Sequence, residues 1–274
     1  MKIGLVPMSA KPYHAGHHML VELAAVSEIT DELKSLQLPV NDAVGVFVSF
    51  SSRGVKKIKD PNDSRTLKQG ASKIEVPKGG ETPVFGTDMK YIWNNLLKPN
   101  LNLPGKVKIV TPDDGAPAAP VRSIHEVCGA LKDAYDAGEE TFTVPYLGTT
   151  ARVEDTIINI YSDDQDIVTN YSDALMTQQY GELWKNQDGP TIKGVGVPRS
   201  ATVEISGTKM RGYLCSGDLD EFANLLPPLP ADVRQEIASI LSNSVQCGLP
   251  RDRQKKSQNE VLLRRYIRSA LILK

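Results

Sequence analysis

Two histidines lie three residues apart near the start of the chain, in the segment His14-Ala15-Gly16-His17. The segment follows an apolar run at residues 3–7 and a turn that contains Pro12. If it opens a helix, both imidazoles can face one ligand, because residues three apart share a helix face. Unpaired amides at a helix start attract anions, and imidazole N–H groups donate to phosphate oxygens. The segment therefore predicts a phosphate-binding site that contains His14 and His17.

Four neighbouring residues extend this predicted site. Gly16 lets the backbone approach a phosphate closely, because it has no side chain. Lys11 can reach the outer phosphates of a nucleotide as a point charge. Met8 and Ser9 stand where the apolar run ends, and we expect them to contact the bound nucleotide.

Other interpretations of the histidines stay open from the residues alone. A His-x-x-His pair also occurs as two zinc ligands, and histidines at a helix cap are often only solvated. We expect His18 to pack or to contact solvent. His125 lies on a predicted helix with no partner nearby in sequence, and we expect no functional role for it.

A second predicted anion site lies almost two hundred residues later, in the segment Ile205-Ser206-Gly207-Thr208-Lys209-Met210-Arg211. Two hydroxyl groups and two cations stand at an expected helix start. The guanidinium of Arg211 could bridge two phosphate groups bidentately. The alternative is an ordinary helix cap with solvated basic residues. The site residues predicted here are Ser206, Gly207, Thr208, Lys209 and Arg211.

Together the two segments resemble the two signatures of the HIGH-motif nucleotidyltransferase superfamily. The stretch VPMSAKPYHAGH is similar to the family's strand, turn, proline and His-x-Gly-His. The stretch ISGTKMR is similar to Ile-Ser-x-Thr-x-x-Arg, the adenylyltransferase form more than the cytidylyltransferase form. The resemblance covers about residues 1–50 and 105–225.

The resemblance implies a role for each matched residue. His14 would stabilise charge on the transferred phosphoryl group, and His17 would hold an α-phosphate oxygen or the nearby ribose. Ser206, Thr208 and Arg211 would hold the β- and γ-phosphates. Lys11 and Lys209 would assist. His14, His17, Arg211 and Lys11 are thus the expected catalytic residues.

The resemblance also implies a reaction. A phosphorylated small-molecule acceptor would attack the α-phosphorus of a nucleoside triphosphate, ATP in the favoured case, with Mg²⁺ present and pyrophosphate leaving. Nicotinamide mononucleotide is one candidate acceptor. The alternatives are a cytidylyltransferase that uses CTP, and a non-catalytic nucleotide-binding or assembly protein that has kept the fold. A homo-oligomer is a further candidate assembly.

The elements that must position these residues follow from hydrophobic patterning and turn residues. Strands are predicted at 3–7, 44–50, 107–110, 141–146, 156–161 and 202–205, and helices at about 17–36, 87–97, 123–137, 207–214, 218–225 and 231–241. We expect Thr87 to cap the second helix. Strand, helix and strand within fifty residues form a βαβ unit. With the resemblance, this predicts an α/β fold: a Rossmann-like parallel sheet with helices on both faces.

The expected organisation is a nucleotidyltransferase domain over residues 1–225 and a helical, basic extension over residues 226–274. A polar stretch at about 51–83 lacks sustained periodicity and is predicted as a long surface insertion. The basic extension is expected to be a solvated helix or an oligomer contact. Contact with nucleic acid is the sharper alternative.

The composition bounds the setting. The formal net charge is −1, so the whole chain has no strong field for nucleic acid or membrane surfaces. No run approaches the roughly 20 apolar residues of a membrane span, so no membrane partner is expected. The 3 cysteines lie far apart without metal-ligand spacing. They indicate a reduced, cytoplasmic protein.

Overall fold

A computed structural model describes most of the chain: residues 1–9, 12–27, 38–50, 55–59, 73–77, 84–198, 205, 207–245 and 247. For residues 55–59, 73–77, 165 and 208 it describes the backbone alone. The chain forms two compact units. The first comprises Met1–Phe50 with Leu101–Ile205, and the second Ser51–Asn100 with Ser206–Lys274. This grouping differs from the expected division after residue 225.

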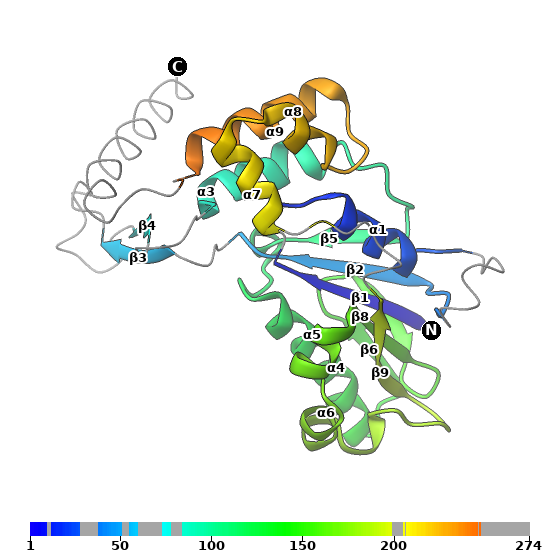
Figure 1. Cartoon of the computed structure of the whole chain (residues 1–274). Helices are drawn as coiled ribbons and strands as arrows, with labels where there is room; N and C mark the ends of the chain where they lie inside the picture. Colours follow the sequence, from blue (N-terminus) through cyan, green and yellow to red (C-terminus); the bar gives the residue numbers. More distant parts are fainter. Residues whose placement is uncertain are drawn as a thin grey trace. The chain divides into compact units, whose positions relative to one another are not determined.

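A five-stranded parallel sheet forms the centre of the first unit (Figure 1). Its strands are β1 (Lys2–Met8), β2 (Ala43–Val48), β5 (Val107–Val110), β8 (Ile157–Asp163) and β9 (Thr191–Val197), in the order β5-β2-β1-β8-β9. The predicted α/β, Rossmann-like parallel sheet is confirmed. The fifth strand is β9, which the sequence did not predict. The strand predicted at 202–205 lies outside the described residues except for Ile205.

Helices cover both faces of this sheet, as predicted (Figure 1). The first-unit helices are α1 (Ala15–Ala24), α4 (Pro120–Asp136), α5 (Asp164–Asn170) and α6 (Asp173–Tyr180), with short 3₁₀ turns η2 (Pro112–Asp114) and η3 (Gly181–Leu183). Alternation along the strands separates the faces. Ile3 and Leu5 join the core that includes Ile124 and Leu131 of α4. Between them, Gly4 faces the opposite side, where α1 lies.

Gly4 keeps that opposite face close to its neighbours. A Cβ on Gly4 would lie 2.9 Å from the side-chain nitrogen of Asn41. The buried Asn41 donates to the carbonyl of Ala24 at the end of α1 and contacts Asn159 and Tyr161 of β8. This polar network therefore joins the last turn of α1 to the sheet, and a side chain at position 4 would displace it.

The helix expected at 17–36 is shorter than predicted within the described residues. It ends at Ala24, and residues 25–27 are not helical, whereas residues 28–37 lie outside the described part. The carbonyl of Ala24 accepts from the Asn41 side chain, and that of Val26 accepts from Lys106 at 2.9 Å. Side chains distant in sequence thus satisfy carbonyls that continued helix would have used.

The strand predicted at 141–146 forms, but not in the parallel sheet. Strand β6 (Thr141–Val144) pairs antiparallel with β7 (Thr149–Arg152) in a separate hairpin. Tyr146 and Gly148 both have positive φ, at 67° and 70°, and they turn the chain back on itself. The prediction missed β7, whose four residues carry one buried side chain, Ala151.

The second unit is mainly helical. Its described elements are α3 (Gly86–Tyr91), the π-helix η1 (Ile92–Leu97), α7 (Gly207–Ser216), α8 (Leu219–Asn224), α9 (Ala231–Ser244) and a hairpin of β3 (Val55–Lys59) and β4 (Lys73–Pro77). The helices predicted at 207–214, 218–225 and 231–241 are confirmed. The cap of α3 is Phe85 and not Thr87. Part of the predicted insertion is this hairpin, which was not expected.

Two contacts tie α3 to α9 within this unit. Ser244 donates to Asp88, and Tyr91 donates to Glu236 at 3.2 Å. The basic segment that was expected to extend α9 falls outside the described residues, apart from Val245 and Cys247. Among the described helices, none combines the length and apolar character needed to cross a membrane.

Candidate functional site

The predicted histidine site lies at the carboxyl edge of the parallel sheet, where the strand order reverses. From β1 the chain proceeds through α1 to β2 on one side, and β8 and β9 lie on the other. Ligands of open α/β sheets bind outside the carboxyl ends of the strands at such a switch point. The histidines follow β1 directly, so the fold places them in this position.

The sheet hydrogen bonding divides at the same point. Strand β1 pairs with β2 as far as Met8 and Val48, but its pairing with β8 ends at Leu5 and Ile160. The last three residues of β1 and of β8 therefore extend beyond their shared ladder. Pro7 contributes to this division, since it has no N–H to donate. The strands β1 and β8 are therefore not hydrogen-bonded to each other at the carboxyl edge.

Helix α1 begins where the sequence predicted a helix start. His14 is the N-cap residue, with extended φ and ψ of −141° and 171°, and its side chain makes no capping hydrogen bond. The imidazole does not compete for the amides of the first turn, which have no acceptors within the helix. Gly16 is buried in that turn. The local geometry for an anion at this helix end is thus present.

The two histidine rings stack on each other. The ring centroids of His14 and His17 are 3.8 Å apart with an interplanar angle of 29°. Tyr13 also stacks with His17: their ring centroids are 5.9 Å apart, and the rings are nearly parallel at 9°. Three rings from one turn of chain therefore form a continuous stack, and the predicted pair is brought together.

Burial keeps both imidazoles uncharged at neutral pH. His14 is 5% exposed, and loss of solvation lowers its pKa to about 4. The pKa of His17 is also lowered well below its ordinary value, first by loss of solvation and then by the nearby His14. Two cationic rings at this separation would repel each other. Each neutral ring keeps one N–H to donate and one nitrogen to accept.

One nitrogen of each ring lacks a hydrogen-bond partner. Nδ1 of His14 and Nδ1 of His17 are both buried and both unsatisfied among the described residues. An unsatisfied buried polar atom costs about 1–3 kcal/mol, and such atoms in a folded protein call for a reason. A ligand oxygen that accepts from these rings would remove the cost. Two such ring nitrogens at one helix start are a feature expected of a phosphate-binding site.

His18 behaves as predicted and packs. It is buried, its Nδ1 lies 3.1 Å from the hydroxyl of Tyr13, and its Nε2 lies 3.4 Å from Glu22. His125 has a partner that the sequence did not indicate, because its Nδ1 lies 2.6 Å from the Tyr180 hydroxyl. Tyr13 is the site residue that sequence reasoning missed. Its place directly before His14 was the available signal.

The remaining residues of the first motif are placed less centrally. Met8 is buried at the end of β1, level with Val48, and Ser9 is exposed just beyond it. Of these two residues, Ser9 is the one whose side chain is exposed and accessible to a ligand. Lys11 lies outside the described residues, so its predicted role is untested.

The second motif opens a helix as predicted. Helix α7 begins at Gly207, with Lys209 exposed and Arg211 half-buried. Each of these two cations has an interaction partner in the structure. Ser206 and the side chain of Thr208 lie outside what the structure describes. The first motif belongs to the first unit. Of the second motif, Ile205 belongs to the first unit and residues 206–211 belong to the second unit.

Carboxylates follow β8 at the same sheet edge as the histidines. Asp163 caps helix α5 by accepting from the amide of Asp166 at 2.9 Å, and Ser162 donates to the Asp166 side chain at 3.3 Å. The described residues contain no group of three or more metal-binding side chains. The expected Mg²⁺ stays a prediction.

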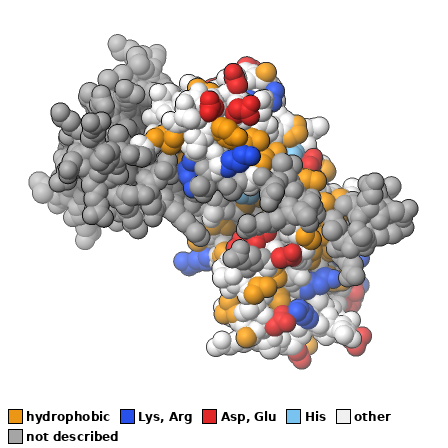
Figure 2. Space-filling model, viewed as in Figure 1, with side chains coloured by type: hydrophobic (Ala, Val, Ile, Leu, Met, Phe, Trp, Pro, Cys, Tyr) orange, Lys and Arg blue, Asp and Glu red, His pale blue; other side chains and the backbone are white. Residues whose placement is uncertain are grey.

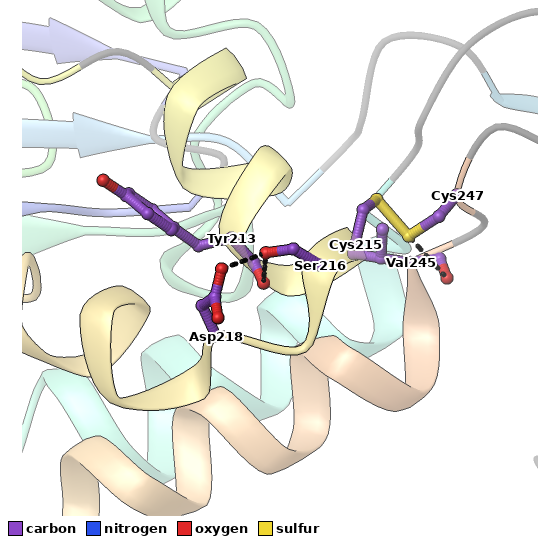
Figure 3. Close-up of a disulfide and its surroundings, with 6 residues drawn as sticks. All are labelled: Tyr213, Cys215, Ser216, Asp218, Val245 and Cys247. Atoms are coloured by element: carbon purple, nitrogen blue, oxygen red, sulfur yellow. Dashed lines mark hydrogen bonds between the residues drawn. A yellow bond between two sulfur atoms is a disulfide. The ribbon is translucent and has the colours of Figure 1, made fainter.

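A disulfide in the second unit corrects the expectation that all cysteines stay reduced. Cys215, in the last turn of α7, bonds to Cys247 beyond α9, 32 residues away, with Cα atoms 5.2 Å apart (Figure 3). Beside it, Ser216 donates to the Tyr213 carbonyl and to Asp218 at the turn into α8. Cys128 is a free, buried thiol. No local pattern indicates this pair, because its partners meet only in the fold.

The face of the molecule shown in Figure 2 carries charges of both signs. On the face shown in Figure 2, acidic and basic side chains of the described residues are interspersed with hydrophobic ones. This agrees with the net charge of −1. The basic stretch that suggested nucleic acid falls almost entirely outside the described residues, and its role stays a prediction.

Comparison with known proteins gives no match: neither a protein-family model nor a curated protein is significantly similar to this sequence. Function must therefore be inferred from the residues of the site itself.

Proposed function

We propose that this chain is a nucleotidyltransferase that transfers AMP from ATP to a small phosphorylated acceptor and releases pyrophosphate. The observation that carries the proposal is the stacked, uncharged pair His14 and His17, with an unsatisfied Nδ1 on each ring, at the switch point of the sheet. A phosphate group is an acceptor with several oxygens, and it suits two donors at one helix start.

The chemistry needs no protein nucleophile. An oxygen of the acceptor phosphate attacks the α-phosphorus of ATP, the bond from that phosphorus to the bridging oxygen breaks, and pyrophosphate leaves. Charge builds up on the oxygens of the α-phosphate during this step. Donors held in fixed positions in a site with little water stabilise such charge strongly. His14 and His17, whose Nδ1 atoms are both buried, have the required character.

Mg²⁺, bound to the triphosphate, would supply charge neutralisation on the leaving pyrophosphate. The residues of this chain supply binding and orientation. The predicted roles of Ser206, Thr208 and Arg211 on the outer phosphates stay predictions, and substitution of Arg211 tests them.

The direct test is pyrophosphate release by the full chain with Mg²⁺, each nucleoside triphosphate in turn and a panel of phosphorylated acceptors that includes nicotinamide mononucleotide. We expect release with ATP and one acceptor. His14→Gln and His17→Gln should each lower kcat/KM by about 100- to 1,000-fold, because each removes a donor to the developing charge.

His125→Gln is the matched control, since it changes a histidine on α4 that lies outside the site. Its activity should stay close to that of the parent. Release with CTP alone would replace the donor and favour the cytidylyltransferase alternative. Nucleotide binding without release for any acceptor would favour a non-catalytic binding protein.

A further inference from the structure

Three polar side chains in contact, Tyr13, His18 and Glu22, lie beside the histidine stack: a hydrogen bond joins the first two and an ion-pair contact the last two. The Tyr13 hydroxyl lies 3.1 Å from Nδ1 of His18, and Nε2 of His18 lies 3.4 Å from a carboxylate oxygen of Glu22. Tyr13 and His18 are buried, whereas the Glu22 side chain is 58% exposed. None of these three residues is needed to explain phosphate binding.

The charge of Glu22 indicates which nitrogen of His18 carries the hydrogen, and therefore which group donates in the contact between Tyr13 and His18. The carboxylate of Glu22 is negatively charged and cannot donate, so it favours the tautomer in which the nitrogen that faces it, Nε2, carries the hydrogen. In the neutral His18 ring, Nδ1 then has no hydrogen and accepts from the Tyr13 hydroxyl. Glu22 thus selects the tautomer of His18, and His18 fixes the hydroxyl of Tyr13.

Tyr13 connects these contacts to the site. Its ring lies nearly parallel to that of His17, and His17 stacks in turn on His14. The ring of His18 meets Tyr13 edge-on, at 88°. Tyr13 therefore contacts His18 through a hydrogen bond and an edge contact, and its ring lies nearly parallel to that of His17.

We propose that Tyr13, His18 and Glu22 form a positioning network that sets the ring orientation of His17 and, through the stack, of His14. The inference deepens the proposed function and rests on it for the identity of the ligand, but the network itself can be tested without a ligand. Residues that orient a site's side chains affect its binding although they do not touch the ligand.

The test reads the imidazole signals of the full-length protein, labelled with ¹⁵N-histidine, by NMR. The parent should show His18 with its hydrogen on Nε2. Tyr13→Phe keeps the ring and removes the hydroxyl, and it should shift the ring signals of His17 and His14. Glu22→Ala should mix the two tautomers of His18 and shift the same signals, whereas Glu22→Gln, which keeps an accepting oxygen, should largely preserve them.

Asp136→Ala is the matched control for Glu22→Ala. It removes a carboxylate from an exposed ion pair four residues apart on α4, with Lys132. It should leave all four histidine signals in place. Because Glu22 is largely exposed, its variants should fold, and thermal unfolding of Glu22→Ala and Asp136→Ala should be similar.

A second readout uses inorganic triphosphate with Mg²⁺ as the probe. Tyr13→Phe and Glu22→Ala should each weaken its binding by about fivefold, which is the loss expected for one modest hydrogen bond. Glu22→Gln should restore most of the affinity. The network is overturned if His14 and His17 signals do not change in Tyr13→Phe and Glu22→Ala, or if Glu22→Gln behaves like Glu22→Ala. Shifted signals with no triphosphate binding by the parent would support the network and reject the proposed function.

Discussion

The two predicted phosphate-binding helices use different physical means. The start of helix α1 presents the buried His14 and the half-buried His17, which are uncharged at neutral pH and stacked on each other. Helix α7 presents two cations, the exposed Lys209 and the half-buried Arg211. A neutral buried donor contributes orientation and resists screening by salt, whereas an exposed cation contributes attraction that salt weakens. For the proposed reaction, we therefore expect the histidines at α1 to stabilise the developing charge, and the cations of α7 to attract the negatively charged triphosphate.

The two helices are also secured differently. Helix α1 is joined to the sheet by the uncharged network of Asn41, Asn159 and Tyr161, all buried. Helix α7 ends in a disulfide that closes a loop through α8 and α9. The chain contains 2 tryptophans, Trp184 in the first unit and Trp93 in the second, and both are buried. Fluorescence of single-tryptophan variants can therefore follow each unit separately.

The largest effect is expected from reduction of the disulfide. Closing a loop of this length stabilises a fold by about 3–4 kcal/mol through the entropy of the unfolded chain. In Trp184→Phe, a dithiol reductant should lower the unfolding free energy reported by Trp93 by about that amount. In Trp93→Phe, the signal of Trp184 should not respond. A response of Trp184 equal to that of Trp93 would show that the units do not unfold separately.

The next effect concerns Arg211. Loss of a charged hydrogen-bond donor costs about 1.5–3 kcal/mol, so Arg211→Ala should weaken Mg²⁺–ATP binding by about 10- to 100-fold. Its dependence on salt should also become shallower, because a permanent charge has been removed. His17→Gln should weaken binding without changing the salt dependence. Titrations at three salt concentrations measure both. Equal salt slopes in the two variants would remove the distinction between the helices.

Acidification should destabilise the first unit. His14 has a pKa of about 4 when folded and 6.5 as the ordinary value, so the unfolded chain binds more protons between these limits. Stability therefore falls as pH falls, by about 2 kcal/mol between pH 7 and pH 5 for His14 alone. The lowered pKa of His17 adds in the same direction.

Urea unfolding of Trp93→Phe at several pH values measures this loss. Adding His14→Gln to the same protein should flatten the dependence between pH 5 and pH 6.5. If the pH dependence of the unfolding free energy is unchanged by that substitution, His14 is not held uncharged by the fold.

The smallest effect is expected at Lys209. Its side chain is exposed, and exposed charges contribute about 0–1 kcal/mol. Lys209→Ala should weaken Mg²⁺–ATP binding by about two- to threefold at low salt, with no difference at high salt. An effect as large as that of Arg211→Ala would mean that both cations contact the nucleotide closely.

Local signals explain what the sequence predicted. Strand β1 is a short apolar run, α1 begins beside the histidines, and α7 begins at Gly207 after a hydroxyl-rich segment. Each is specified by adjacent residues. The parallel sheet followed from the βαβ pattern and from the family resemblance.

Contacts distant in sequence explain what was missed. Strand β9 contains two glycines, and one of them, Gly194, admits Ile167 of α5, which no local pattern reveals. The end of α1 depends on Asn41 and Lys106. The disulfide and the stack of Tyr13 on His17 depend on three-dimensional positions. Lys11, Ser206 and the side chain of Thr208 lie outside the described residues and stay predictions.

The central claim is that His14 and His17 bind the phosphates of a nucleotide. The most direct measurement is a titration of the full-length ¹⁵N-histidine protein with Mg²⁺–ATP, observing all four imidazoles. The account predicts that His14 and His17 shift together along one saturable curve, that an anion beside them raises the pKa of both, and that His125 does not move. Saturable binding of Mg²⁺–ATP that leaves the signals of His14 and His17 unchanged would contradict it.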